Sequence, residues 1–287
     1  MSSGSHRPRG RAKRSLGQNF LVDRSICRRI VEAVEIQPGE TVLEIGPGRG
    51  ALTDDLAEAA DRLVLVELDN DLAAHHLRRF AHRRDVKVIQ GDILETDVVQ
   101  AAECEPGHLR VVGNIPYNIT TPILFHVLMR PRPADLHLMV QREVADRILA
   151  EPGGGTYGAL SVGVRSIASV DRVLQVPRGA FRPRPRVDST VIRVRPHRPE
   201  PLTEAEEVRL RRLVRAVFQW RRKQLGRTLR AHPDLEMPVP AMEEALAELG
   251  IESSRRPESL SPQQFIALSR HLPPAPEDGD LARDRGL

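Results

Sequence analysis

The 287-residue sequence has few aromatic residues and few cysteines. Six Phe, two Tyr and one Trp make up only 3% of the chain, so an aromatic side chain set among charged neighbours is a candidate for binding rather than for filling the core. Two cysteines, Cys27 and Cys104, exclude a disulfide framework and a cysteine metal cluster. Because such isolated thiols are typical of a reducing cytosol, we expect a cytoplasmic protein with no metal ligands of this kind.

An apolar run long enough to span a membrane is also lacking, so no membrane partner is expected. Residues 1–14 hold five basic residues and no acid, and no apolar stretch follows them, which argues against a secretory signal. We expect a flexible basic tail that is either solvated or bound to nucleic acid. At the other end, residues 273–287 are Pro-rich and then acidic, a composition typical of a disordered tail.

Positive charge is concentrated in one further segment. The formal net charge is only +4, yet residues 209–230 contain nine basic residues and no acid. This segment is either an ordinary solvated surface or an electrostatic footprint for phosphates. The candidate phosphate-binding residues are Arg221, Arg222, Lys223 and Arg227.

A glycine turn follows the first predicted strand. Residues 41–45 form a short apolar run that leads into Gly46-Pro47-Gly48-Arg49-Gly50 and then a helical pattern, the plan of a nucleotide-binding crevice. The spacing differs from the dinucleotide Gly-x-Gly-x-x-Gly, and no Gly-Lys-Ser/Thr follows. A pyrophosphate ligand is therefore disfavoured, although glycines also serve any tight turn between a strand and a helix.

Two acids stand at the ends of the next two predicted strands, Glu67 after residues 62–66 and Asp92 after residues 86–91. An acid about 20 residues beyond the glycines binds ribose hydroxyls in folds of this kind. The order therefore suits S-adenosylmethionine, with Glu67 accepting from the ribose and Asp92 from the adenine amine. Alternatively, either acid could be a helix N-cap.

A fourth predicted strand ends in Asn114-Ile115-Pro116-Tyr117. The exocyclic amine of adenine is a poor nucleophile because its lone pair is delocalised into the ring. The Asn114 side-chain oxygen and the Ile115 carbonyl, fixed by Pro116, could hold such an amine, and Tyr117 could supply a flat face for an unpaired or flipped-out base. A simple Pro-Tyr turn after a buried strand is the alternative.

Two other segments raise similar choices. Phe181 is followed by Arg182-Pro183-Arg184-Pro185-Arg186, which favours a base-stacking role, although it could instead pack beneath the strand predicted after residue 190. Gln18-Asn19-Phe20-Leu21 precedes Asp23, and this segment could be an ordinary helix start in which Asp23 is the cap and Phe20 and Leu21 form an apolar staple. It could also fold over the cofactor as a lid.

Six ordered motifs carry a resemblance to a known family, the ribosomal RNA adenine dimethyltransferases. They are Gly17–Leu21, Glu44–Gly48, Gly91–Asp92, Asn114–Pro122, Met139–Val144 and Phe181–Ser189. Three further segments resemble the small-subunit (16S), kasugamycin-sensitivity branch of the family, and the macrolide-resistance branch, which acts on 23S RNA, matches the last two of them less well. These segments are Thr156–Val162, Arg221–Leu225 and Glu258–Phe265.

The resemblance implies an S-adenosylmethionine-dependent enzyme, acting as a monomer, that places four methyl groups on N6 of two adjacent adenines near the 3′ end of 16S ribosomal RNA in a small-subunit particle. It implies a substrate site formed by Asn114, Ile115, Pro116, Tyr117 and Phe181. The implied cofactor-binding residues are Asn19, Leu21, Gly46, Gly48, Glu67, Asp92, Ile93 and Asn114. A non-catalytic ribosome assembly factor with this fold is a further alternative.

The expected fold is a Rossmann-like α/β domain over residues 15–200, with a mostly parallel sheet. The Pro-rich segment 196–201 is typical of a stiff linker, and only helical periods follow it. Residues 201–272 are therefore predicted to form a small, all-helical, RNA-binding domain.

Overall fold

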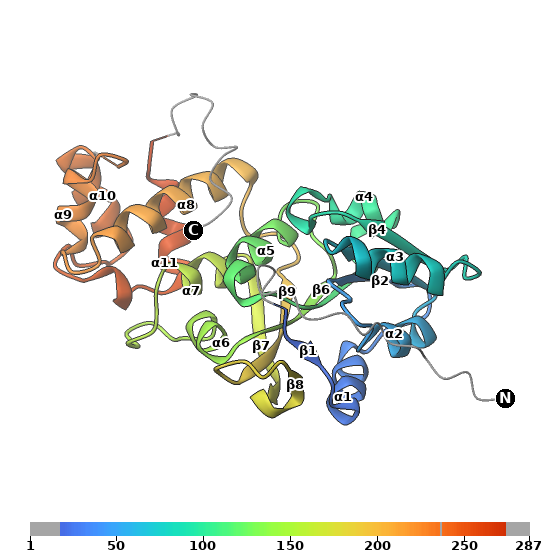
Figure 1. The fold of residues 1–287 in the computed structure, drawn as a ribbon. Coiled ribbons are helices and arrows are strands. Elements are labelled where there is room, and N and C mark those ends of the chain that lie inside the picture. The colour runs from blue at the N-terminus through green and yellow to red at the C-terminus, as the bar shows by residue number, and fades with distance from the viewer. Residues whose placement is uncertain (1–17, 236, 274–287) are drawn as a thin grey trace. The chain divides into compact units, whose positions relative to one another are not determined.

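The computed structural model describes residues 18–273, with the exception of residue 236 (Figure 1). The predicted basic tail, and the C-terminal tail apart from Pro273, lie outside the described residues. The chain divides into two compact units. One contains the described residues up to Ala145 together with Asp171–Arg195, and the other contains Asp146–Val170 and the described residues from Pro196 onward.

A seven-stranded sheet has the strand order β4-β3-β2-β5-β6-β9-β7. The neighbours β2/β3, β3/β4, β2/β5 and β5/β6 are parallel, whereas β9 is antiparallel to β6. The mostly parallel sheet predicted from the sequence is therefore confirmed. Its strands are β2 (Thr41–Ile45), β3 (Arg62–Glu67), β4 (Val86–Gln90), β5 (Leu109–Asn114), β6 (Asp135–Gln141), β7 (Ala168–Val176) and β9 (Ser189–Pro196).

The central strands are nearly continuous apolar runs because both faces of a parallel sheet are covered. Every residue of β2 is buried, as are Leu63–Glu67 of β3. Helices alternate with the strands along the chain (Figure 1). They are α1 (Arg24–Val34), α2 (Thr53–Ala59), α3 (Asn70–Arg79), α4 (Val98–Ala102), α5 (Thr120–Val127), α6 (Arg142–Ile148) and α7 (Ala159–Arg165).

Helix α1 begins directly after its N-cap residue, Asp23. The Asp23 side chain accepts from the backbone N–H groups of Ser25 and Ile26, which satisfies two donors that the first turn leaves free. Its buried face carries Ile26, Ile30, Val31 and Val34 at helical spacing. The cap that the sequence offered as one alternative is therefore present.

Two short strands far apart in the sequence form a separate ladder. Strand β1 (Phe20–Leu21) is antiparallel to β8 (Phe181–Arg182), with Leu21 opposite Phe181 (Figure 1, blue and yellow). The backbone N–H of Val22 extends the ladder by donating to the Ala180 carbonyl at 2.8 Å. The segment before α1 is thus held by residues near the C-terminal end of the first unit.

The second unit is built mainly from α8 (Glu204–Gln219), α9 (Leu225–Ala231), α10 (Val239–Glu248) and α11 (Pro262–Arg270). Capping boxes start two of them, with Thr203 and Glu206 at α8 and Ser261 and Gln264 at α11. None of the helices in the described part of the chain is long and apolar enough to cross a membrane.

Residues Asp146–Val170 group with these helices, although the sequence division placed them in the first domain. The fully buried Tyr157 explains the grouping, because its hydroxyl donates to the Leu260 carbonyl at 2.8 Å. Its ring also meets Phe218 edge-on, with ring centroids 6.4 Å apart. The helical unit therefore depends on a segment that precedes the linker.

Candidate active site

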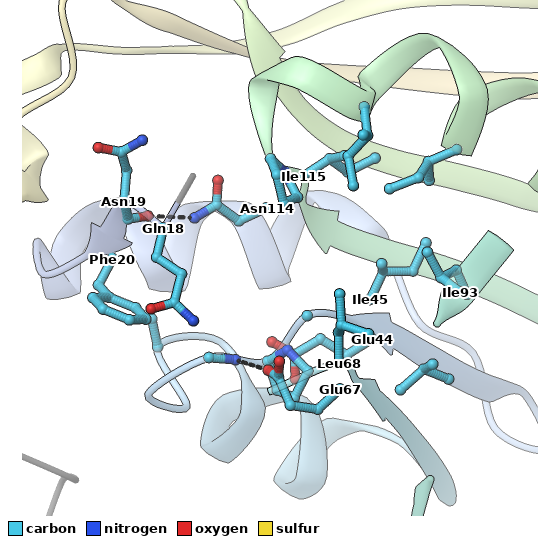
Figure 2. A pocket seen from close by; sticks show the side chains of 18 of the residues that line it. Gln18, Asn19, Phe20, Glu44, Ile45, Glu67, Leu68, Ile93, Asn114 and Ile115 are labelled. Atoms are coloured by element: carbon cyan, nitrogen blue, oxygen red, sulfur yellow. Dashed lines mark hydrogen bonds between the residues drawn. The ribbon is translucent and has the colours of Figure 1, made fainter. Parts of the chain in front are cut away.

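A cavity of about 330 Å³ opens in the first unit where the parallel strands end (Figure 2). Ligand sites in open α/β sheets lie outside the carboxyl ends of the strands, and this volume is typical of small-molecule sites. The wall includes the ends of β2, β3 and β5, the Gly91–Ile93 segment after β4, and residues 18–21. Every predicted cofactor residue lines the cavity, namely Asn19, Leu21, Gly46, Gly48, Glu67, Asp92, Ile93 and Asn114.

The glycine turn needs glycine for two physical reasons. Gly46, Gly48 and Gly50 have φ values of 61°, 57° and 76°, which L side chains rarely adopt. A Cβ atom on Gly48 would also lie 3.3 Å from the ring of Phe20. The turn can therefore keep its bare backbone against the cavity only with glycine at these positions.

Glu67 holds this turn from β3. Its Oε2 accepts from the Gly48 N–H at 2.9 Å (Figure 2, dashed line at Glu67). Its Oε1 accepts from the Asp69 N–H, also at 2.9 Å. The side chain is 5% exposed, and this burial raises the pKa of its carboxyl group. Glu67 thus fixes the turn in addition to lining the cavity.

His76 holds the same turn from α3, a role that the sequence analysis missed. Its Nε2 lies 2.9 Å from the Gly48 carbonyl oxygen, and because a carbonyl only accepts, Nε2 must carry the proton. Burial lowers the pKa of the ring, which favours this neutral form. The spacing of Leu72, Ala73 and His76 along α3 was the available signal that this histidine faces inward.

Glu44, inside β2, is a second missed residue. It lines the cavity at 3% exposure, and its Oε2 is buried without a hydrogen-bond partner among the described residues. Burial raises the pKa of this carboxyl group to about 8, and the nearby Glu67 and Asp54 carboxylates act in the same direction. The cavity wall therefore contains an acid that is mostly protonated at neutral pH.

Asp92 is the helix N-cap that the sequence offered as one alternative, and it also lies in the cavity wall. Its Oδ1 accepts from the Leu94 N–H at 2.9 Å, so it caps the short 3-10 helix η2 (Ile93–Glu95). It also lines the cavity, next to the buried Ile93 and the 47% exposed Leu68. A carboxylate cap at this position keeps a second oxygen that can face a ligand.

Asn114, the last residue of β5, has a fixed orientation. Its Nδ2 donates to the backbone carbonyl of Asn19 at 3.0 Å (Figure 2). Since a carbonyl cannot donate, this hydrogen bond sets which side-chain atom is the nitrogen. The Oδ1 atom receives no hydrogen bond from the residues that the structure describes.

Residues 18–21 form a wall of the cavity as well as the approach to α1. The Gln18 amide donates to Asp69 at 3.1 Å, and the Arg49 guanidinium lies 4.3 Å from the centroid of the Phe20 ring. The cap and the lid proposed for this segment are thus compatible, because Asp23 caps α1 while residues 18–21 lie against the glycine turn.

The segment after Asn114 turns sharply. Ile115 is buried and Pro116 lines the cavity, and Tyr117 begins the 3-10 helix η4 (Tyr117–Ile119). The half-buried Tyr117 ring also lines the cavity, and its hydroxyl lies 2.7 Å from the Ser189 hydroxyl. The cavity thus places the predicted base platform beside the predicted amine acceptor.

Phe181 does not match the base-stacking expectation. Its side chain is fully buried, and it packs in the hydrophobic core with Leu21, Met139 and Val191. It does not line the cavity, because β8 pairs with β1 and turns this ring inward. The structure therefore assigns Phe181 to the core, which was the alternative drawn from the sequence.

The four predicted RNA-binding residues lie at and after the end of α8, in the second unit. Arg221, Arg222 and Lys223 form the turn before α9, and Arg227 lies within α9. Arg221 is paired with Glu258 at 3.1 Å and also donates to the Gly155 carbonyl. Arg222, Lys223 and Arg227 are exposed. Within residues 18–273 other than 236, no three His, Cys, Asp or Glu side chains group as metal ligands.

Comparison with known proteins gives the class and then the family. Two solved structures share this architecture. One is a dimethyladenosine transferase from Plasmodium falciparum, 26% identical with a TM-score of 0.73, covering 87% of this chain and 95% of that one. The other is the 23S rRNA methyltransferase ErmE, 29% identical with a TM-score of 0.66, covering 88% and 99%. The fold is therefore that of the Rossmann-like rRNA methyltransferases.

Two curated relatives have higher sequence identity to this chain than these two solved structures have. "Ribosomal RNA small subunit methyltransferase A" of Acinetobacter baylyi is 42% identical over 92% of this chain and 93% of its own length. The protein of the same name from Moorella thermoacetica is 44% identical over 91% and 92%. The sequence profile of the ribosomal RNA adenine dimethylase family matches residues 9–271. The chain belongs to this family, as the motifs predicted.

Proposed function

We propose that this protein transfers methyl groups from S-adenosylmethionine to N6 of two adjacent adenines near the 3′ end of 16S ribosomal RNA, within a small-subunit particle. The observation that carries the proposal is the shared cavity. Asn114, Pro116 and Tyr117 line the same space as the glycine turn, Glu67 and Asp92. One cavity thus offers a nucleoside-type site beside groups suited to an amine and a base.

The residues present fit S-adenosylmethionine. The glycine turn allows close approach to the amino-acid part, Glu67 can accept from the ribose, and Asp92 from the adenine amine. The buried, unpartnered Oε2 of Glu44 suits a ligand that carries positive charge. When bound there, this cofactor would supply an electrophilic methyl group on its sulfonium.

The chain's own residues would orient the target amine. Asn114 Oδ1 and the Ile115 carbonyl accept from the two amine hydrogens, and the Tyr117 ring supports the base. These hydrogen bonds strengthen as the nitrogen gives up its lone pair and its hydrogens become more acidic, so they stabilise the transition state more than the ground state. The Asn19 carbonyl helps to orient the amine indirectly. It accepts from Nδ2 of Asn114, which leaves Oδ1 rather than Nδ2 to face the amine.

Two features favour the small-subunit target over 23S RNA. The relatives at 42% and 44% identity carry the small-subunit name, whereas ErmE is 29% identical. The segments Arg221–Leu225 and Glu258–Phe265, which the macrolide-resistance branch matches less well, are joined by the ion pair between Arg221 and Glu258 at 3.1 Å. The helical unit would bind phosphates through the exposed Arg222, Lys223 and Arg227, with Arg221 as a fourth phosphate ligand.

The test is single-turnover methylation of small-subunit particles that lack the modification. Asn114→Ala should lower the rate roughly 10²-fold or more, as for loss of one oriented hydrogen-bond partner of a transition state. Asn70→Ala is the matched control. The Oδ1 of Asn70 accepts a hydrogen bond from the Gln90 side-chain amide at 2.9 Å, and Asn70 does not line the cavity. A near-normal rate for Asn114→Ala would rule out Asn114 as the amine acceptor.

Assays of the wild-type protein distinguish the small-subunit methyltransferase from the two alternatives, a 23S RNA methyltransferase and a non-catalytic assembly factor. Methyl transfer to 23S RNA but not to small-subunit particles would favour the macrolide-resistance activity. Binding to the particle without transfer to any ribosomal RNA would favour an assembly factor.

A further inference from the structure

The hydroxyl groups of Tyr117 and Ser189 lie 2.7 Å apart, although 72 positions separate them in the sequence. Each is the other's only hydrogen-bond partner among the described side chains. Tyr117 lines the cavity, whereas Ser189 is fully buried at the start of β9. An aromatic ring of the cavity wall is therefore tied to the sheet at its polar end.

Ser189 is itself held firmly. It pairs with Gln141 in the ladder between β6 and β9. The residue before it, Asp188, accepts from the Arg142 N–H through its carbonyl at 3.0 Å and from the Arg178 N–H through its side chain at 2.9 Å. The Ser189 hydroxyl is thus presented from backbone that is anchored on three sides.

Tyr117 is anchored at its other end by the turn after Pro116. The Pro116 carbonyl accepts from the Ile119 N–H at 3.2 Å and from the Thr120 hydroxyl at 3.3 Å, which fixes the backbone of the 3-10 helix. The hydroxyl oxygen lies on the long axis of the tyrosine ring, so fixing it together with the Cα fixes χ1 and the direction of that axis. The hydrogen bond with Ser189 therefore sets the position and direction of the ring axis relative to Asn114, three residues earlier.

We propose that Ser189 is a positioning residue for methyl transfer, acting through the Tyr117 hydroxyl to hold the ring as a fixed platform for the target base. This inference rests on the proposed function, because the platform matters only if a base enters the cavity. It also gives a role to the serine that ends the Phe181–Ser189 motif, for which the sequence offered no separate function.

A double-mutant cycle tests the catalytic part. Ser189→Ala and Tyr117→Phe each remove the same hydrogen bond, so each should lower the single-turnover rate about tenfold or more, since small misplacements of reacting groups are costly. The double variant should be no slower than the slower single variant. Cofactor affinity should stay within about twofold, and Ser189→Thr should restore part of the rate because it keeps the hydroxyl.

Ser269→Ala is the matched control. Ser269 is also fully buried and its hydroxyl donates a hydrogen bond of 2.7 Å, to the Ile266 carbonyl of α11. Its loss should lower the melting temperature without changing the rate. The inference is overturned if Ser189→Ala behaves like this control, or if the losses from Ser189→Ala and Tyr117→Phe multiply.

A second readout needs no methyl transfer. The chain contains only two tyrosines, so incorporation of 3-fluorotyrosine yields two fluorine resonances, which Tyr117→Phe assigns. Ser189→Ala should shift and average the Tyr117 signal as its ring gains freedom, while the buried Tyr157 signal stays unchanged. An unchanged Tyr117 signal refutes the inference. If the Tyr117 signal responds but the wild type methylates no ribosomal RNA, the Ser189 hydroxyl does restrain the Tyr117 ring and the proposed function is wrong.

Discussion

Replacing Glu44 with Gln should remove a pH dependence from the stability of the protein. Burial raises the pKa of this carboxyl group from 4.5 to about 8 in the folded state. Between these two values the folded protein keeps a proton that the unfolded chain has released. The contribution of Glu44 to the free energy of unfolding is therefore at its maximum below pH 4.5 and falls as the pH rises toward 8. This is the direction expected for a group whose pKa is raised in the folded state.

The magnitude follows from the size of the shift. At about 1.36 kcal/mol per pKa unit, the rise to about 8 corresponds to an upper bound of roughly 5 kcal/mol. The side chain is only 3% exposed, so solvent screening reduces this little. Gln has nearly the same shape but no charge, and the variant should lack this loss of stability.

The assay is urea unfolding of both proteins at several pH values between about 5 and about 8. The free energy of unfolding of the wild type should fall relative to that of Glu44→Gln by several kcal/mol across this range. The subtraction removes the contributions of titrating groups that do not interact with Glu44. Parallel pH profiles for the two proteins would refute the reasoning.

The same group predicts a proton linkage to cofactor binding. A positively charged ligand beside Glu44 would favour the carboxylate, so binding of S-adenosylmethionine near pH 7 should release up to about one proton. Calorimetry in two buffers with different ionisation enthalpies measures this number. The Glu44→Gln variant should release none from this site.

Three other changes give distinct outcomes. Glu67→Gln should weaken S-adenosylmethionine binding by about 1 to 3 kcal/mol in calorimetry, with RNA affinity nearly unchanged; unaltered cofactor affinity would contradict the ribose assignment. Phe181→Leu should lower the free energy of unfolding by about 1 to 2 kcal/mol yet keep the methylation rate of the folded enzyme, because the ring lies in the core; a greatly reduced rate at full stability would restore the stacking role. Replacing Arg221, Arg222 and Lys223 with Ala should flatten the slope of log affinity for the particle against log salt by roughly 0.7 to 0.9 for each phosphate that is no longer neutralised; an unchanged slope with early melting would leave these residues a structural role, through the contacts of Arg221 with Glu258 and Gly155.

Local patterns were sufficient to predict the central strands and the cavity wall. The apolar runs predicted at residues 41–45 and 62–67 are β2 and β3, since a parallel strand buried on both faces is continuous in apolar residues. Polar residues at the ends of the parallel strands, such as Glu67 of β3 and Asn114 of β5, lie at one edge of the sheet because parallel strands end on the same side.

Pairings between distant segments could not be predicted. The burial of Phe181 depends on the ladder between β1 and β8, whose strands are two residues long and lie at opposite ends of the first unit's sequence. The same limit applies to Tyr157, whose partners Leu260 and Phe218 lie beyond the linker. The role of Glu44 needed the cavity itself, since this acid lies inside β2. The spacing along α3 indicated that His76 faces inward, but not that it contacts the Gly48 carbonyl.

The proposed methylation is measured by incubating the wild-type protein and S-adenosylmethionine with small-subunit particles from a strain that lacks this modification. Mass spectrometry of the fragment near the 3′ end of 16S ribosomal RNA should then show four added methyl groups, two on N6 of each of two adjacent adenines. Asn114→Ala should leave the fragment unmodified over the same time. No added methyl groups with the wild type, or methyl groups found on 23S RNA instead, would contradict the account.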